Sequence, residues 1–169
     1  MGAFTQRYVT IATDISMDPN TGLTAWACWI RYDGGTIRRS GVLVRKVRST
    51  SMAETLALCN ALFIAKNSVK DWGACRVIIH NELENVLTPL LNKSGQLAVK
   101  DINRSDAILN VAMPILDLSQ SWECRKIKAH YKKWQASENP AKYAMNRWCD
   151  KESRRVMRTA RNACAKDSK

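Results

Sequence analysis

Residues 8–14 read Tyr8-Val9-Thr10-Ile11-Ala12-Thr13-Asp14, an apolar and β-branched run that ends on an acidic side chain. Such a composition favours extended backbone, so residues 7–14 are predicted to form a β-strand. A second run, Arg76-Val77-Ile78-Ile79-His80-Asn81-Glu82, follows the same pattern and also closes on an acid. Acids at the ends of strands in an otherwise basic chain indicate a cation site that meets phosphate.

Two further strands are predicted between these runs, over residues 22–33 and 36–48. The intervening Asp33-Gly34-Gly35 is a strong hairpin signal, because glycine tolerates positive φ. Strands one to three are therefore expected to form an antiparallel meander. We expect Ile37, Val42 and Val44 of the third strand to face inward, and Arg38, Arg45 and Lys46 to be exposed.

The remainder of the chain alternates helical and extended patterns. Apolar residues recur at helical spacing over residues 51–66, and a buried strand is predicted over 75–82. Helices are predicted over 83–92, 104–118 and 141–164, with a fifth strand over 122–130. This order, βββαβ(αα)βα, predicts an α/β protein in which helices pack on a mixed sheet. We expect one domain over 1–169, with its core at about 7–158 and a basic C-terminal helix and tail at 141–169.

The overall charge points to a polyanionic partner. Lys and Arg number 27 against 15 Asp and Glu, which gives a net charge of +12 for 169 residues and a pI near 9.7. Neutralising phosphates releases condensed counterions, so this excess favours a nucleic acid. Apolar runs are too short for a membrane span. The six cysteines show no metal-ligand spacing, which favours reduced, packed thiols and a cytoplasmic protein.

Two more acids lie at helical positions. Glu54 falls near the start of the helix predicted over 51–66, and Asp150 lies in the basic C-terminal helix. A purely structural interpretation of Glu54 is open, because Ser51 followed by Glu54 is a capping-box pattern with Ser51 as the N-cap. Hard carboxylate oxygens suit Mg²⁺, and four packed carboxylates destabilise a protein that holds no cation.

Five motifs, in order, resemble those of type 1 ribonuclease H. They are Thr13-Asp14-Ile15-Ser16, Met52-Ala53-Glu54, residues 75–82, Lys128-Ala129-His130 and Asn146-Arg147-Trp148-Cys149-Asp150. The resemblance implies a ribonuclease H-like five-stranded mixed sheet, with antiparallel strands one to three followed by parallel strands four and five, flanked by helices. It implies that the chain hydrolyses the RNA strand of RNA–DNA hybrids and leaves a 5′-phosphate and a 3′-hydroxyl.

The resemblance also assigns roles to individual residues. Asp14, Glu54, Glu82 and Asp150 would be catalytic ligands of two Mg²⁺ or Mn²⁺ ions that flank the scissile phosphate. His130 would assist product departure, although a hydrogen-bonded cap of the strand end is its structural alternative. Ser16, Asn20, Thr50 and Ser51 would contact the hybrid backbone. The partner would be a nucleic acid. The protein would act as a monomer and would not associate with a membrane.

The chain departs from the family pattern at several positions. Glu82 stands where the family has aspartate, and Ile15 where it has glycine. The enlarged loop after His130 adds Lys132 and Lys133 as candidate nucleic-acid contacts. Two other functions are therefore open: a structure-specific DNA nuclease related to junction resolvases, and a nucleic-acid-binding module with weakened catalysis. Five basic residues of the C-terminal helix are either a solvated face or a nucleic-acid contact: Lys151, Arg154, Arg155, Arg158 and Arg161.

Overall fold

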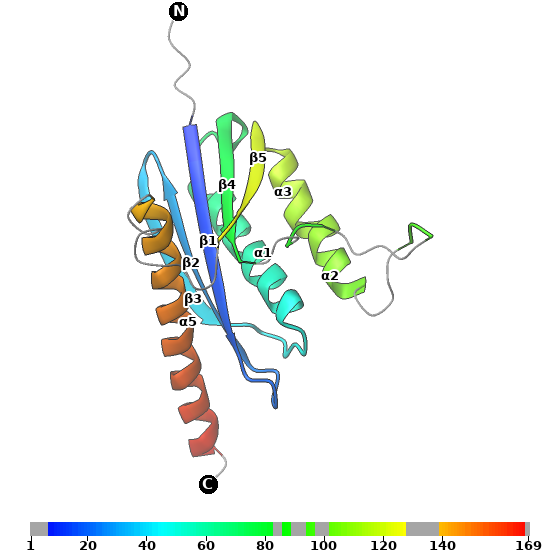
Figure 1. Ribbon diagram of the computed structural model, residues 1–169, viewed down its shortest axis with the longest axis vertical. Helices are drawn as coiled ribbons and strands as arrows, with labels where there is room; N and C mark the ends of the chain where they lie inside the picture. Colours follow the sequence, from blue (N-terminus) through cyan, green and yellow to red (C-terminus); the bar gives the residue numbers. More distant parts are fainter. Residues whose placement is uncertain (1–6, 83–85, 89–93, 97–101, 128–138, 168–169) are drawn as a thin grey trace, which may run out of the picture.

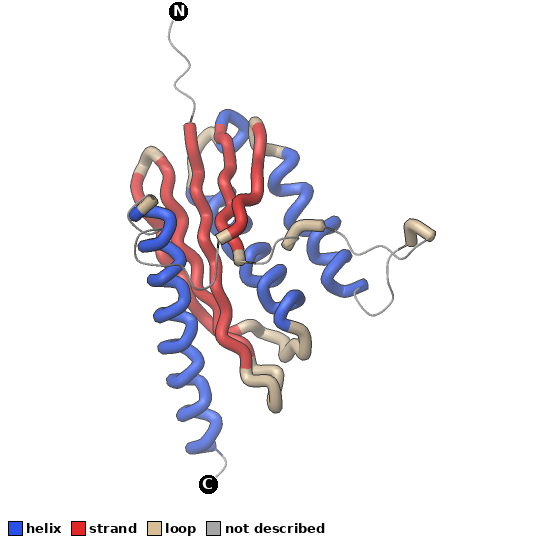
Figure 2. Tube along the Cα trace, viewed as in Figure 1, coloured by secondary structure: helices blue, strands red, loops and turns tan. Residues whose placement is uncertain are grey.

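A five-stranded sheet with the strand order β3-β2-β1-β4-β5 forms the centre of the protein (Figures 1 and 2). The structure is a computed structural model that describes residues 7–82, 86–88, 94–96, 102–127 and 139–167. The strands are β1 (Arg7–Met17), β2 (Thr24–Tyr32), β3 (Gly35–Val42), β4 (Cys75–Asn81) and β5 (Ser121–Lys126). The first three pair antiparallel, whereas β4 pairs parallel to both β1 and β5. The mixed five-stranded sheet expected from the sequence is confirmed.

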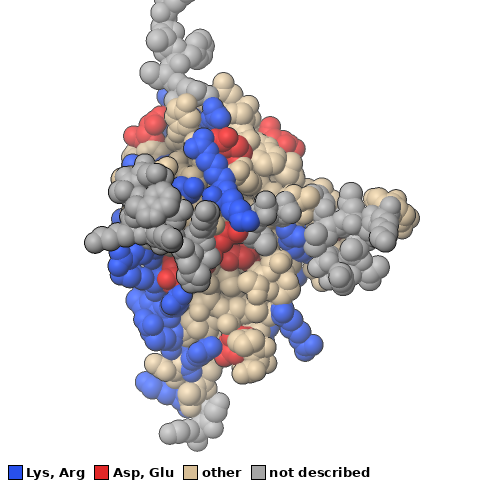
Figure 3. All heavy atoms as spheres, viewed as in Figure 1, with Lys and Arg blue, Asp and Glu red and all other residues tan. Residues whose placement is uncertain are grey.

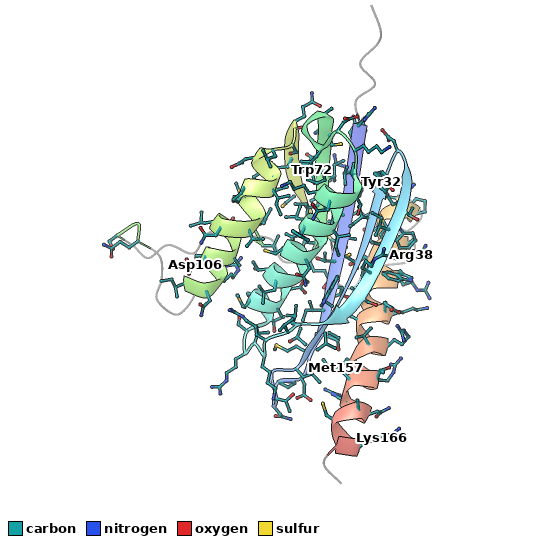
Figure 4. The ribbon with its side chains drawn as sticks, turned by 180° about the vertical axis from the view of Figure 1, so that it is seen from behind. Tyr32, Arg38, Trp72, Asp106, Met157 and Lys166 are labelled. Carbon is teal, nitrogen blue, oxygen red and sulfur yellow. The ribbon has the colours of Figure 1, made fainter. Side chains whose placement is uncertain are left out.

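Helices cover both faces of this sheet (Figure 1). They are α1 (Thr50–Ser68), the 3₁₀ turn η1 (Trp72–Ala74), α2 (Ile102–Ala107), the π-helical turn η3 (Ile108–Ala112), α3 (Met113–Asp117) and α5 (Pro140–Asp167). Seen from behind, α1 lies on one face with α2 and α3 beside it, and α5 lies on the other face (Figure 4). Of the helix predicted over 83–92, residues 86–88 form a turn and the others lie outside the described residues.

Two apolar layers hold the helices on the sheet. The larger packs odd-numbered β1 residues, such as Val9 and Ile11, against Leu58 and Leu62 of α1. The smaller packs Ala12 against Met145 and Cys149 of α5. Side chains alternate between the two faces of a strand, so the odd-numbered residues of β1 face α1 and the even-numbered residues face α5. Asp14 therefore shares the α5 face with Ala12.

The same alternation separates two tryptophans of β2. Trp26 packs against the α1 layer, while Trp29 packs against the α5 layer. The ring of Trp29 meets that of Trp148 edge-on at 5.9 Å, and the Arg38 guanidinium lies 3.6 Å from the Trp29 centroid. Such aromatic and cation–π contacts stabilise the packing beyond the effect of the apolar area that the rings bury.

The third strand is shorter than predicted. It ends at Val42 instead of continuing to residue 48, and β3 is an edge strand. Val42 and Val44 are 39% and 108% exposed, so the prediction that they face inward is wrong. Only Ile37 of the three packs against the core. An edge strand has a neighbour on one side only, and Val44 lies beyond the last paired residue.

Within the described residues, no helix is both long enough and apolar enough to cross a membrane.

Candidate metal and nucleic-acid site

The four acids of the predicted site line one cavity. The cavity has a volume of about 490 Å³, and its walls come from β1, the segment after β4, the start of α1 and one face of α5. The lining residues are Asp14, Ile15, Ser16, Thr50, Glu54, Glu82, Asn146, Arg147, Asp150 and Arg154. Acids distant in sequence are thus brought together at one end of the parallel strand pair.

The pairing of β1 with β4 places the first two acids. Parallel strands end at the same edge of a sheet, and the register pairs Ala12 with His80. Two residues further along each chain lie Asp14 and Glu82, which therefore reach the same level. Asp14 accepts a hydrogen bond of 2.8 Å from the backbone N–H of Ile15, which fixes the carboxylate near its own backbone.

The start of α1 places Glu54. Ser49 is the N-cap of this helix, because its hydroxyl accepts a 3.3 Å hydrogen bond from the N–H of Met52. The predicted N-cap at Ser51 is therefore wrong, since Ser51 already lies inside the helix. Glu54 lies beyond the first turn and takes no part in a capping box. The interpretation of Glu54 as a capping-box residue is therefore wrong, and Glu54 lines the cavity instead.

The opposite wall of the cavity is one face of α5. Asn146, Asp150 and Arg154 are spaced four residues apart, so they share a side of the helix. The side-chain amide of Asn146 donates a 3.3 Å hydrogen bond to Oε1 of Glu82. Arg154 forms a 2.8 Å ion pair with Asp150. Asn146 and Arg147 were not predicted as site residues, although their helical spacing from Asp150 was the signal available. For Arg154, a nucleic-acid contact was one of two open interpretations, and the structure places it at the cavity wall.

Burial and mutual repulsion raise the pKa of two carboxyls. Burial is the largest cause at Asp14, whose pKa rises from 3.8 to about 7; the N–H of Ile15 opposes this rise, and the charges of Glu82 and Asp150 add to it. At Glu54, burial again dominates and the charges of Asp14 and Glu82 add to it, which raises the pKa to about 8. Like charges held in a partly dry cavity favour protonation. The positive charge of Arg154 at the cavity wall lowers the pKa of Asp14 but does not offset burial and the repulsion between the carboxylates.

The donor atoms suit a hard divalent cation. Carboxylate and amide oxygens are the ligands that Mg²⁺ and Mn²⁺ prefer. The Oδ1 atom of Asn146 is buried and accepts no hydrogen bond from the described residues, so one more oxygen donor is unpaired at the cavity wall. Among those residues, however, no three His, Cys, Asp or Glu side chains already converge closely enough to hold one ion. The donor set fits in chemistry, and bound cations would have to draw the carboxylates together.

The structure separates the predicted backbone contacts into two groups. Ser16 and Thr50 line the cavity beside the acids. Asn20 lies in the exposed turn after β1, where its N–H donates to Asp18, and Ser51 accepts a hydrogen bond from Thr55 through its carbonyl. Neither Asn20 nor Ser51 lines the cavity. His130, Lys132 and Lys133 lie outside the described residues, so their predicted roles stay predictions.

Two other residues, His80 of β4 and Ile15 of β1, pack against the interior of the protein. His80 is 5% exposed, and burial lowers its pKa to about 4, which makes it a packed neutral histidine. Ile15, which replaces the family's glycine, packs against the cluster of Val47, Met52 and Ala53 while still lining the cavity. Part of its side chain is therefore absorbed by the core.

A basic cavity of about 420 Å³ lies beyond the start of α1. Its walls include Arg45, Lys46, Arg48 and Ser49, together with Asn103 from α2. Guanidinium and ammonium groups near the N-terminus of a 19-residue helix favour an anion. This basic cavity and the acidic cavity both border the first turn of α1.

Solved structures with a similar fold include ribonucleases H. The N-terminal ribonuclease H domain of a Mycobacterium tuberculosis protein superposes with a TM-score of 0.64 at 14% identity, over 93% of this chain and 98% of that one. LC11-RNase H1, solved in complex with an RNA/DNA hybrid, gives 0.63 at 17% identity, over 90% and 98%. RNase H1 of the archaeon Halobacterium salinarum gives 0.60 at 16% identity, over 90% and 98%.

No protein-family model matches the sequence, and no curated protein sequence matches it significantly. The resemblance to type 1 ribonuclease H is thus confirmed for the fold, over about nine tenths of the chain. At identities of 14–17%, the comparison shows architecture alone.

Proposed function

We propose that the protein is a metal-dependent endonuclease that hydrolyses the RNA strand of RNA–DNA hybrids and leaves a 5′-phosphate and a 3′-hydroxyl. One observation carries the proposal: four acids from separate elements line a single cavity whose buried carboxyls repel one another. A neighbour in fold was solved with an RNA/DNA hybrid, which supports this substrate class.

In this proposal Asp14, Glu54, Glu82 and Asp150 hold two Mg²⁺ or Mn²⁺ ions. The cations would supply Lewis acidity and a hydroxide-like water at neutral pH. Asn146 holds the Glu82 carboxylate in place from α5, because its amide donates to Oε1. In this proposal the contact positions the carboxylate of the longer glutamate side chain.

The other cavity residues would bind the nucleic-acid backbone. Arg147 and Arg154 present guanidinium groups at the wall, where they can contact phosphate. The hydroxyls of Ser16 and Thr50 can donate hydrogen bonds to phosphate or to the ribose 2′-hydroxyl, which distinguishes RNA from DNA. Selectivity then follows from backbone shape, and base sequence has little influence.

A substrate panel tests the proposal. Labelled RNA–DNA hybrid, RNA duplex, DNA duplex and four-way junction are incubated with Mg²⁺, with Mn²⁺ and with EDTA, and the product ends are mapped. We expect cleavage of the RNA strand of the hybrid alone, lost with EDTA and in Asp14→Asn. Asp117→Asn, an exposed acid at the end of α3, is the matched control and should cleave normally. Cleavage of the junction, joined by a stable dimer in light scattering, would establish the resolvase-like alternative instead.

One observation favours the non-enzymatic alternative, a nucleic-acid-binding module. Within the described residues, no three acidic, histidine or cysteine side chains are already arranged around one ion. The same panel decides between them, because a module would bind hybrid in every condition and cleave it in none. Isothermal titration with Mg²⁺ gives a second readout, since only the enzyme requires Asp14-dependent uptake of cations.

A further inference from the structure

Five basic side chains form one stripe along α5. Arg147, Lys151, Arg154, Arg158 and Arg161 are all exposed, and their spacing alternates four and three residues. At 100° per residue, such spacing keeps them within about 80° of the helix circumference. Over these positions the helix rises about 21 Å. We call this set the α5 stripe.

The stripe begins inside the acidic cavity and continues away from it. Arg147 and Arg154 line the cavity beside the acids. Arg161, two turns further along, forms a 3.2 Å ion pair with Asp18 in the turn after β1. Figure 3 shows Lys and Arg atoms gathered over α5, next to the acidic atoms at the centre of this face. In Figure 4 the helix runs past the buried Met157 to Lys166 at the far end of the molecule.

The positive charge of the stripe is only partly neutralised by acidic neighbours. Arg154 and Arg161 pair with Asp150 and Asp18, yet their side chains remain 65% and 52% exposed. For Lys151 and Arg158, no ion pair forms within the described part of the chain. The other exposed side of α5 differs, because there Arg155 is held by Glu152 and the pKa of that glutamate falls to about 2 through this hydrogen bond.

We propose that the α5 stripe is the track along which one nucleic-acid strand leaves the catalytic cavity. With a rise of about 3.4 Å per nucleotide along a strand, a 21 Å stripe runs beside roughly six phosphates. The location of the cut relative to this track rests on the proposed function, whereas the binding of the strand to the stripe does not.

The energetics follow from counterion release. Each neutralised phosphate contributes about 0.9 to the slope of log K against log salt. Removing two contacts lowers that slope by about 1.8, which at 0.1 M salt amounts to a loss of affinity of up to roughly 60-fold. Arg161 is the exposed partner of its ion pair with the largely covered Asp18, so its guanidinium can exchange that contact for phosphate at modest cost.

The test compares two double variants that remove the same charge. Lys151→Gln with Arg158→Gln disrupts the α5 stripe without touching the cavity lining. Lys66→Gln with Lys70→Gln is the matched control, since both lysines are exposed near the far end of α1. Binding to a labelled hybrid is measured by fluorescence anisotropy in EDTA across a salt series, so that cleavage cannot interfere. Circular dichroism establishes that each variant is folded.

We expect the stripe variant to lose about 1.8 units of salt slope and the control variant to match the unmodified protein. Lys151→Arg with Arg158→Lys preserves charge and should restore binding. Equal losses in the two glutamine variants would overturn the proposal, as would a stripe variant that binds normally. Stripe-dependent binding to vesicles of anionic phospholipid, without stripe-dependent binding to nucleic acid, would overturn it too.

Failure of the proposed function gives a different result. A protein that cleaves nothing in the substrate panel, yet needs Lys151 and Arg158 to bind hybrid, refutes the nuclease and keeps the track. A protein that cleaves hybrid while both glutamine variants behave alike keeps the nuclease and refutes the track.

Discussion

Asp14→Asn should make the metal-free protein more stable at neutral pH. The substitution keeps the shape of the side chain and an oxygen that can accept the 2.8 Å hydrogen bond from Ile15. It removes a carboxyl that burial, with Glu82 and Asp150, renders costly to ionise. A purely structural aspartate would respond in the opposite direction.

The magnitude follows from the pKa. The value rises from 3.8 to about 7, a difference of roughly three units. At 1.36 kcal/mol per unit the upper bound is about 4 kcal/mol, and relaxation of the neighbouring carboxylates reduces the expected gain to about 1–3 kcal/mol. For a chain of this size, that gain corresponds to an increase in Tm of roughly 2–12 °C.

The pH dependence has a definite sign. The folded pKa of Asp14 exceeds the unfolded one, so between about 4 and 7 the folded protein binds more protons. Stability of the unmodified protein therefore falls as pH rises through that window. The advantage of Asp14→Asn should be full above about pH 7 and should shrink as the pH approaches 4.

Thermal unfolding in EDTA between pH 4.5 and 8 measures the difference, with Asp117→Asn as the control for loss of one negative charge. Adding Mg²⁺ should stabilise the unmodified protein more than Asp14→Asn. An Asp14→Asn variant that is no more stable than the unmodified protein at pH 8 would refute the reasoning, because the acids would then not repel one another.

Three other predictions concern separate parts of the chain. Ser49→Ala should cost about 1 kcal/mol of unfolding free energy, because Ser49 caps α1, whereas Ser51→Ala should cost little; equal effects in urea titrations would contradict this assignment. Glu82→Asp should keep or raise the rate of hybrid cleavage if glutamate is a compromise at this position, and a tenfold loss in steady-state kinetics would show that its length is needed. His130→Ala should slow turnover by roughly 10²-fold with an unchanged Tm, and normal turnover or simple unfolding would leave His130 a structural residue.

The sequence predicted the order of the elements because periodicity and turn residues are local signals. The hairpin at Gly34-Gly35 and the first strand depend on neighbours in the chain, and both appear in the structure, although β1 continues past the predicted end at Asp14 to Met17. The packing of Trp26 and Trp29 on opposite faces follows from alternation alone. The acids were predicted to gather, and the structure places them around one cavity, while their roles stay predictions.

The errors arose where tertiary contacts decide between local alternatives. Ser49 and Ser51 can both cap a helix, and in the structure the backbone is extended at Ser49 and already helical at Ser51, which makes Ser49 the cap. Val44 has a strong strand propensity but lies beyond the end of β3, where no neighbouring strand pairs with it. Asn146 is uncharged, so nothing in the sequence assigned it to a cation site. Its place in the site depends on a hydrogen bond to Glu82, which lies 64 positions away in the sequence.

The packing of α5 on β1 also determines when the acidic cavity can form during synthesis of the chain. Cys149 of α5 donates to the carbonyl of Ala12 across 137 positions, so one wall of the cavity is translated long after the other. At about 5–20 residues per second, that separation corresponds to roughly 7–27 s. A nascent chain therefore exposes Asp14 for about that interval, and Glu82 for about half of it, before Asp150 emerges to complete the cavity. Cleavage by a protease ahead of α5 would return the protein to that incomplete state.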